Sequence, residues 1–295
     1  MESMKINISF VLCILGQAVS QVFTSGPDKR VHDEGKRLCR GYEIQKMHTI
    51  NGKLFMKTGL WYSLTNVSDN PKRDEPFFSA HMCKNYMDSC YNLFNNKTYI
   101  LEHYPIRYEK DDGTVYTREN CSVTIVDEAT QQYTIFKLPN YFYSKICCND
   151  HNIFIKKMIN RNDYAVEIYD LNMQLVGMHN FSDFSENKKI QCIECYSENG
   201  QPFLVVSFND CIRCYSIIDN SLYFTNYMDF ELFEDEKVTK MSTNEEHTHL
   251  LVSLFSSVRY GGSSRIILFC DDASGHVVYD GEGYVIGYCP SLSPS

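Results

Sequence analysis

The chain has 295 residues, enough to bury a sizeable core as one domain. Hydrophobic residues make up 43% of it and aromatic residues 14%, which excludes wholesale disorder. The net charge of −9 opposes a general role on nucleic acid, because that role needs a basic surface. We therefore expect a single folded domain over 1–295, with no nucleic acid among its partners.

Residues 1–26 have two interpretations. In the first, apolar runs over 8–15 and 18–24 are two strands joined at Gly16-Gln17. In the second, residues 1–20 are a signal peptide cleaved after Ser20. We favour the strands, and with them an intracellular, cytoplasmic location, while secretion is the alternative. No apolar run reaches the roughly 18 residues of a membrane helix, so we expect no membrane span.

Short apolar stretches begin to recur after this segment. Residues 44–78 contain four of them, around the turn-forming pair Asn51-Gly52, and predict a first four-stranded unit. Residues 79–104 do not follow the same spacing. We expect an insertion or a degenerate repeat there.

A degenerate sequence pattern recurs in the second half of the chain. Its order is a turn, an apolar strand, a polar corner and an alternating strand, and it predicts units at about 105–138, 144–181, 190–228 and 238–280. The ends of the alternating strands are aligned at Asp127, Asp170, Ser216 and Asp271, in steps of 43, 46 and 55 residues. Periods of about 40–45 residues with several short strands are typical of a β-propeller blade.

The last predicted strand, 284–289, begins a further unit that the chain does not complete. Because an unpaired edge strand promotes aggregation, we expect 8–15 or 18–24 to pair beside it. The sequence thus predicts an all-β fold, a β-propeller of about six or seven four-stranded blades, closed by pairing of N- and C-terminal strands. A β-sandwich or a barrel is the alternative.

Several repeat segments resemble the WD40 repeat family. Tyr-Ser-Glu-Asn-Gly at 196–200, Asn209-Asp210 before the strand 212–216, and the closing pair Tyr169-Asp170 match its turn, corner and strand end. The resemblance covers about residues 105–290, and no repeat carries the Trp-Asp pair of the family. It implies a docking platform rather than a catalyst, with a protein or peptide partner bound on the propeller face.

Cysteine is the residue type that most strongly suggests chemistry. Cys192, Cys195, Cys211 and Cys214 have the spacing of a four-cysteine zinc ribbon. However, residues i and i+3 of a strand lie on opposite faces, and no Gly or Pro within either pair assists a bend. We expect buried cysteines that act as small hydrophobes, and no metal or other cofactor, with zinc as the alternative. In a secreted chain, disulfides between neighbouring strands are expected instead, with a pairing that the sequence does not give.

Glycosylation sequons occur at Asn7, Asn66, Asn96, Asn120 and Asn180, of which Asn66, Asn96 and Asn180 are the candidate sites in a secreted chain. The sequence contains no nucleophile elbow, P-loop or dinucleotide fingerprint, so we expect no enzyme. The leading hypothesis is a non-enzymatic protein-interaction scaffold. The alternative is a secreted, disulfide-bonded glycoprotein that acts as a ligand or receptor-binding module.

Overall fold

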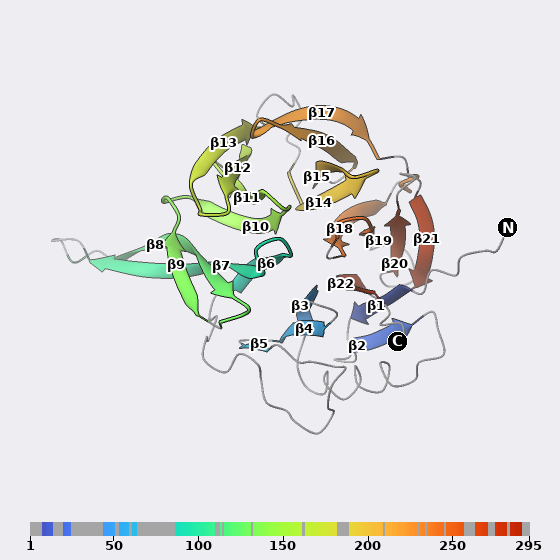
Figure 1. Ribbon diagram of the computed structural model, residues 1–295, viewed down its shortest axis with the longest axis horizontal. Helices are drawn as coiled ribbons and strands as arrows, with labels where there is room; N and C mark the ends of the chain where they lie inside the picture. Colours follow the sequence, from blue (N-terminus) through green and yellow to red (C-terminus); the bar gives the residue numbers. More distant parts are fainter. Residues whose placement is uncertain are drawn as a thin grey trace, which may run out of the picture. The chain divides into compact units, whose positions relative to one another are not determined.

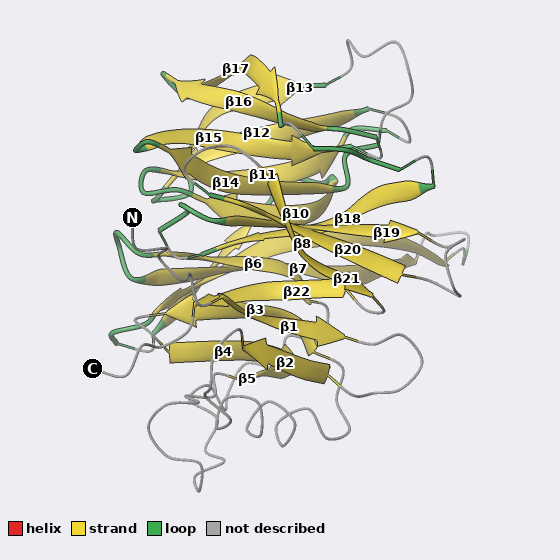
Figure 2. Cartoon of the chain, turned by 90° about the vertical axis from the view of Figure 1, so that its right-hand side faces the viewer, coloured by secondary structure: helices red, strands yellow, loops and turns green. Residues whose placement is uncertain are grey.

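A computed structural model describes residues 8–13, 20–24, 44–50, 53–58, 61–63, 86–109, 113, 115–130, 132–160, 163–181, 189–208, 210–228, 230–233, 235–244, 246–256, 263–270, 275–281 and 284–290. The regular elements in these ranges are the strands β1 to β22, with no helix among them (Figures 1 and 2). Accordingly, the described part of the chain has no helix that is long and apolar enough to cross a membrane. The fold is therefore all-β, as predicted.

Contacts divide the chain into two compact units. The first comprises Met1–Met82, Tyr196–Asn199 and Met228–Ser295, and the second comprises Cys83–Cys195 and Gly200–Tyr227. The expectation of one domain over 1–295 stays a prediction.

Three four-stranded antiparallel sheets make up the second unit, apart from the end of one strand. Their strands are β6 (Tyr86–Asn92), β7 (Lys97–Glu109), β8 (Val115–Asp127) and β9 (Tyr133–Lys137); β10 (Phe142–Cys148), β11 (Asn152–Met158), β12 (Tyr164–Asp170) and β13 (Leu175–Asn180); and β14 (Cys192–Glu198), β15 (Gln201–Ser207), β16 (Ile212–Ile218) and β17 (Ser221–Tyr227). In each sheet the spatial order equals the chain order, so neighbouring strands are joined by short corners. Such sheets are consistent with propeller blades.

The first unit holds one four-stranded and two three-stranded sheets. They are formed by β18 (Glu236–Thr243), β19 (Leu250–Ser256), β20 (Ser263–Phe269) and β21 (Gly275–Gly281); by β3 (Ile44–Ile50), β4 (Lys53–Thr58) and β5 (Trp61–Ser63); and by β2 (Ser20–Thr24), β1 (Ile8–Cys13) and β22 (Tyr284–Pro290). In the last sheet β1 lies between β2 and β22, with Phe10 opposite Tyr288 and Leu12 opposite Val285. The predicted pairing of an N-terminal strand with the last strand is confirmed.

Core packing in the second unit explains the strong apolar runs of the middle sheet. Six of the seven residues of β11 and of β12 are buried, whereas the outer strand β13 is mostly exposed. One buried cluster joins this sheet to β14–β16, and another joins it to β6–β8. Successive residues of a strand face opposite sides, so Cys147 belongs to the first cluster and Cys148 to the second.

Asparagine recurs at the first corner of three sheets. The side-chain oxygens of Asn92, Asn149 and Asn244 accept hydrogen bonds from backbone amides three to five residues further along the chain. Asparagine favours such corners because its short side chain replaces a backbone partner in the turn. In addition, Asn92 donates to the carbonyl oxygen of Asn149, which ties the corner of one sheet to that of the next.

The segment 79–104 does not interrupt the repeat where the structure describes it. β6 and most of β7 fall inside it, and they are the first two strands of the sheet that ends with β9. This unit therefore starts at Tyr86 rather than near residue 105. In the predicted unit 44–78, three strands are present, and the fourth stretch, 77–78, lies outside the described residues.

Candidate interaction surface

The four cysteines with ribbon-like spacing lie in one sheet but not on one metal site. Cys192 and Cys195 belong to β14 and Cys214 to β16, with Cys211 directly before it, and β15 separates the two strands. In the described part of the chain no three His, Cys, Asp or Glu side chains are grouped as metal ligands would be. Cys195 instead faces the cluster shared with the neighbouring sheet, where its sulfur lies 3.7 Å from that of Cys147.

The three described repeat markers, Asp127, Asp170 and Ser216, occupy the third strands of their sheets. Asp127 pairs with the first residue of β7 and Asp170 with the first residue of β11, so they are equivalent by register. Ser216 lies two residues before the corresponding end of β16, and Asp271 lies outside the described residues. Asp127 accepts hydrogen bonds from the amides of Thr130 and Ala129, which hold the pKa of its carboxyl below its usual value. Its role in the structure is to shape a turn.

The candidate glycosylation sites differ in how accessible they are. Asn180 is exposed at the end of β13, an outer strand. Asn96 is half-buried at φ 53°, and its side-chain oxygen accepts a hydrogen bond from the hydroxyl of Tyr91. Asn66 lies outside the described residues. Of the two described sites, Asn180 has the accessibility that a glycan needs.

Exposed apolar side chains gather on the outer strands β13 and β17. Leu175 and Met178 on β13, and Tyr223, Phe224 and Tyr227 on β17, are each between 50% and 56% exposed. The two strands contact each other at the edge of their sheets. The backbone of β13 packs closely against the turn before β17 at Gly177, where an added Cβ would come within 2.2 Å of the carbonyl oxygen of Asn220. We call these five side chains the outer-strand patch; within it Tyr223 and Phe224 are successive residues of β17 and so face opposite sides of the sheet.

A buried arginine contacts two of the aromatic side chains of the patch, Phe224 and Tyr227. The guanidinium carbon of Arg213, a residue only 9% exposed, lies 5.2 Å from the ring centres of Phe208 and Tyr227 and 5.8 Å from that of Phe224. The rings of Phe224 and Tyr227 also meet edge to face, with centroids 5.1 Å apart. Cation–π and edge-to-face contacts of this kind hold aromatic side chains in place. Phe224 and Tyr227 are thus preorganised, which lowers the entropy lost when a partner binds.

Both outer strands lack the features that usually protect a sheet edge. Neither β13 (LVGMHN) nor β17 (SLYFTNY) contains Asp, Glu, Lys, Arg or Pro, whereas β9 ends in Lys137 and β21 contains Asp280. Among the described residues no strand pairs with the free edge of β17. Its backbone donors and acceptors are available for one more strand.

Sequence reasoning did not find this patch. Alternating strands were predicted over 190–228, but alternation alone does not reveal which strand of a sheet is outermost. One signal was available, namely the run Ser221–Tyr227, which combines three large aromatic residues with no charge.

Comparison with known proteins adds little. No protein-family model and no curated protein sequence matches the chain. Among solved structures, the β-propeller domain of Cps50 (Swd1) from Myceliophteria thermophila is similar, with 12% identity and a TM-score of 0.43, covering 81% of this chain and 86% of that one. A TM-score below 0.5 does not establish a common fold, so the propeller interpretation depends on the repeated four-stranded sheets themselves.

Proposed function

We propose that the chain is a non-enzymatic docking platform of the WD40-like propeller type. The six sheets are its blades, and the sheet β2-β1-β22, which contains strands from both ends of the chain, closes the ring. The repeated four-stranded antiparallel sheets and the pairing of β1 with β22 support this proposal.

The partner is an extended, uncharged peptide segment that adds to β17 as a further strand. The observation that carries this proposal is the outer-strand patch beside a free sheet edge, with Phe224 and Tyr227 held in place by Arg213. Strand addition takes its affinity from main-chain hydrogen bonds and its specificity from alternate side chains. The five side chains of the patch are uncharged in a chain of net charge −9, and the rings of Phe224 and Tyr227 lie against the buried guanidinium of Arg213, so an uncharged segment suits this surface.

A phage-displayed library of linear peptides tests this proposal directly. Peptides selected on the intact protein are expected to be apolar and uncharged, and their affinities are measured by fluorescence anisotropy. Tyr223→Lys places a charge on the edge strand, where Tyr223 is 54% exposed, so it should leave the fold intact. It should weaken binding about tenfold or more, which corresponds to about 1.4 kcal/mol.

A matched control is available on another outer strand. Ile135 of β9 is 53% exposed, so Ile135→Lys adds the same charge at the same exposure without touching the patch. Equal loss of affinity in both variants, or no loss in Tyr223→Lys, would contradict the proposed site. A concentration-dependent dimer that Tyr223→Lys abolishes would show that a second copy of the chain occupies the edge instead.

The secreted glycoprotein is the second candidate function. It is favoured by the exposed sequon at Asn180 and by the short distance between the sulfurs of Cys147 and Cys195. When the chain is expressed in a secretory pathway, this candidate predicts loss of residues 1–20 and added glycan mass, which disappears in Asn180→Gln. An intact mass that retains the N-terminus without glycan would count against secretion and support the intracellular, cytoplasmic location that we propose.

A further inference from the structure

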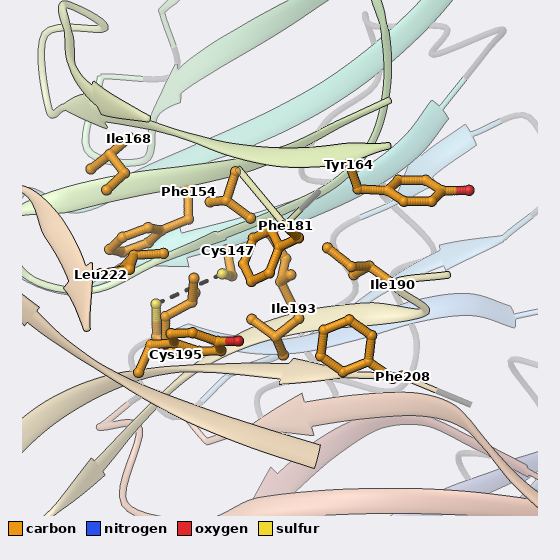
Figure 3. Packing of buried hydrophobic residues seen from close by; sticks show 14 residues of the cluster. Cys147, Phe154, Tyr164, Ile168, Phe181, Ile190, Ile193, Cys195, Phe208 and Leu222 are labelled. Carbon is orange, nitrogen blue, oxygen red and sulfur yellow. Dashed lines mark hydrogen bonds between the residues drawn. The ribbon is translucent and has the colours of Figure 1, made fainter. Parts of the chain in front are cut away.

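Two cysteines from neighbouring sheets face each other inside the core. Cys147 lies on β10 and Cys195 on β14, the first strands of their sheets, and each is only 1% exposed. Their sulfurs are 3.7 Å apart, and Figure 3 shows them pointing toward one another among Phe154, Ile193 and Leu222. Both are free thiols in this structure.

The geometry points to a disulfide between Cys147 and Cys195 that links the two sheets when the chain folds under oxidising conditions. Disulfide sulfurs lie about 2.05 Å apart, so the pair must close by roughly 1.6 Å, which small side-chain rotations can supply. The bond would enclose β11, β12 and β13 together with the last residues of β10, because the two residues are 48 positions apart. It is independent of the docking function proposed above.

Three other cysteines of the second unit are less suited to join this bond, whereas Cys211 packs against the same cluster as Cys147 and Cys195. Cys90, Cys121 and Cys148 belong to the cluster on the opposite face of the sheet β10–β13. The thiol of Cys148 donates to the carbonyl oxygen of Tyr91 and therefore points away from Cys195. Cys147 and Cys148 are adjacent in β10 but face opposite sides of the sheet, so Cys147 is placed to pair with Cys195 and Cys148 is not.

The chemistry is thiol–disulfide exchange with a low-molecular-weight disulfide such as oxidised glutathione. The thiolate of one cysteine attacks the oxidant, forms a mixed disulfide and releases one small thiol. The second thiolate attacks this mixed disulfide, forms the protein disulfide and releases the second small thiol. The two cysteines are oxidised, the oxidant is reduced to two thiols, and the protons of the cysteines pass to these leaving groups.

Exchange should take place before the sheets pack. Burial raises the pKa of the Cys147 thiol, and burial likewise raises the pKa of the Cys195 thiol. Since the thiolate is the reactive form, the folded and reduced protein should resist both oxidation and alkylation. The redox state of the pair is therefore set by the environment in which the chain folds.

The test refolds the denatured, reduced full chain in a glutathione redox buffer and, in parallel, with excess reductant. Free thiols are alkylated under denaturing conditions, and tandem mass spectrometry assigns the linked cysteines. We expect a Cys147–Cys195 link in the oxidised sample alone, with a melting temperature about 5–10 °C above that of the reduced protein. Cys148→Ser should retain the link, whereas Cys147→Ser and Cys195→Ser should lose it.

Two results would overturn the inference. One is full alkylation of both cysteines after oxidative refolding to native circular dichroism. The other is a link from Cys147 or Cys195 to a different cysteine. The wild-type measurement decides between these outcomes without any variant, so a misfolded substitution does not obscure the answer. Peptide binding at β17 is measured separately, and its loss would leave the result for the cysteines unchanged.

Discussion

Two consecutive lysines of β11 are both buried, and their partners differ. Lys157 forms an ion pair with Glu167 at 2.7 Å, and the hydroxyls of Tyr143 and Tyr169 donate to the same carboxylate. Lys156 donates instead to the carbonyl oxygen of Ile190 at 2.6 Å. A carbonyl dipole compensates a buried charge less than a carboxylate does. Burial accordingly lowers the pKa of Lys156 to about 8.

Lys156 should therefore give the protein a distinctive pH dependence. Its folded-state pKa of about 8 lies below the usual 10.5, so between these values the unfolded chain binds the extra proton and stability rises with pH. Replacing Lys156 by Met removes this titration. The free energy of unfolding of wild type minus that of Lys156→Met should rise from pH 8 to pH 10, with a slope of up to about 1.4 kcal/mol per pH unit.

Urea unfolding at a series of pH values measures this difference. Burial also raises the pKa of Tyr143 and Tyr169, but both tyrosines are present in both proteins, so their contribution cancels. Lys137→Met, on the exposed strand β9, shows the effect of deleting a lysine from the surface. Parallel curves for wild type and Lys156→Met would mean that the buried amine does not titrate in this range.

Predicting individual elements from the sequence worked best where strands are short. The predicted units 144–181, 190–228 and 238–280 coincide closely with the sheets β10–β13, β14–β17 and β18–β21. Their strands have six to eight residues and end at Asn, Asp or Gly corners, so alternation and turn chemistry agree. Here local pattern and tertiary structure give the same answer.

The expectation of an insertion or a degenerate repeat at 79–104 stays a prediction, although the described residues 86–104 belong to β6 and β7 of a four-stranded sheet. β7 and β8 each have 13 residues, whereas strands typically have about 5–6, so the repeat is stretched beyond the expected period. β7 also contains Pro105, and proline in a strand is confined to edge positions. In the structure it lies opposite Glu119, beyond Glu102, where the pairing of β6 ends, so it occupies an edge position.

The candidate site and the cysteine pair were beyond sequence reasoning for a different reason. Exposure of Tyr223 depends on β17 being the outermost strand of its sheet, and the approach of Cys147 to Cys195 depends on which sheets are neighbours. Both are properties of strand order and sheet packing. The alternation of one strand contains no information about either.

At the scale of the whole molecule, the two ends of the chain share one sheet. β1 is its middle strand and pairs with β2 on one side and β22 on the other. Without the N-terminal strands, the backbone groups of β22 that face β1 have no strand partner in this sheet. A buried backbone group that loses its hydrogen bond costs about 1–3 kcal/mol.

Deleting residues 1–24 should therefore lower the melting temperature sharply or abolish soluble expression. Deleting only residues 1–7, which precede β1, is the matched control and should have little effect. Leu12→Pro tests the same pairing without truncation, because proline removes a backbone donor from the middle strand of the sheet. Circular dichroism melting compares the three variants. If the protein lacking 1–24 folds with unchanged stability, the strand pairing is dispensable, the segment acts as a signal peptide, and the secreted glycoprotein becomes the leading function.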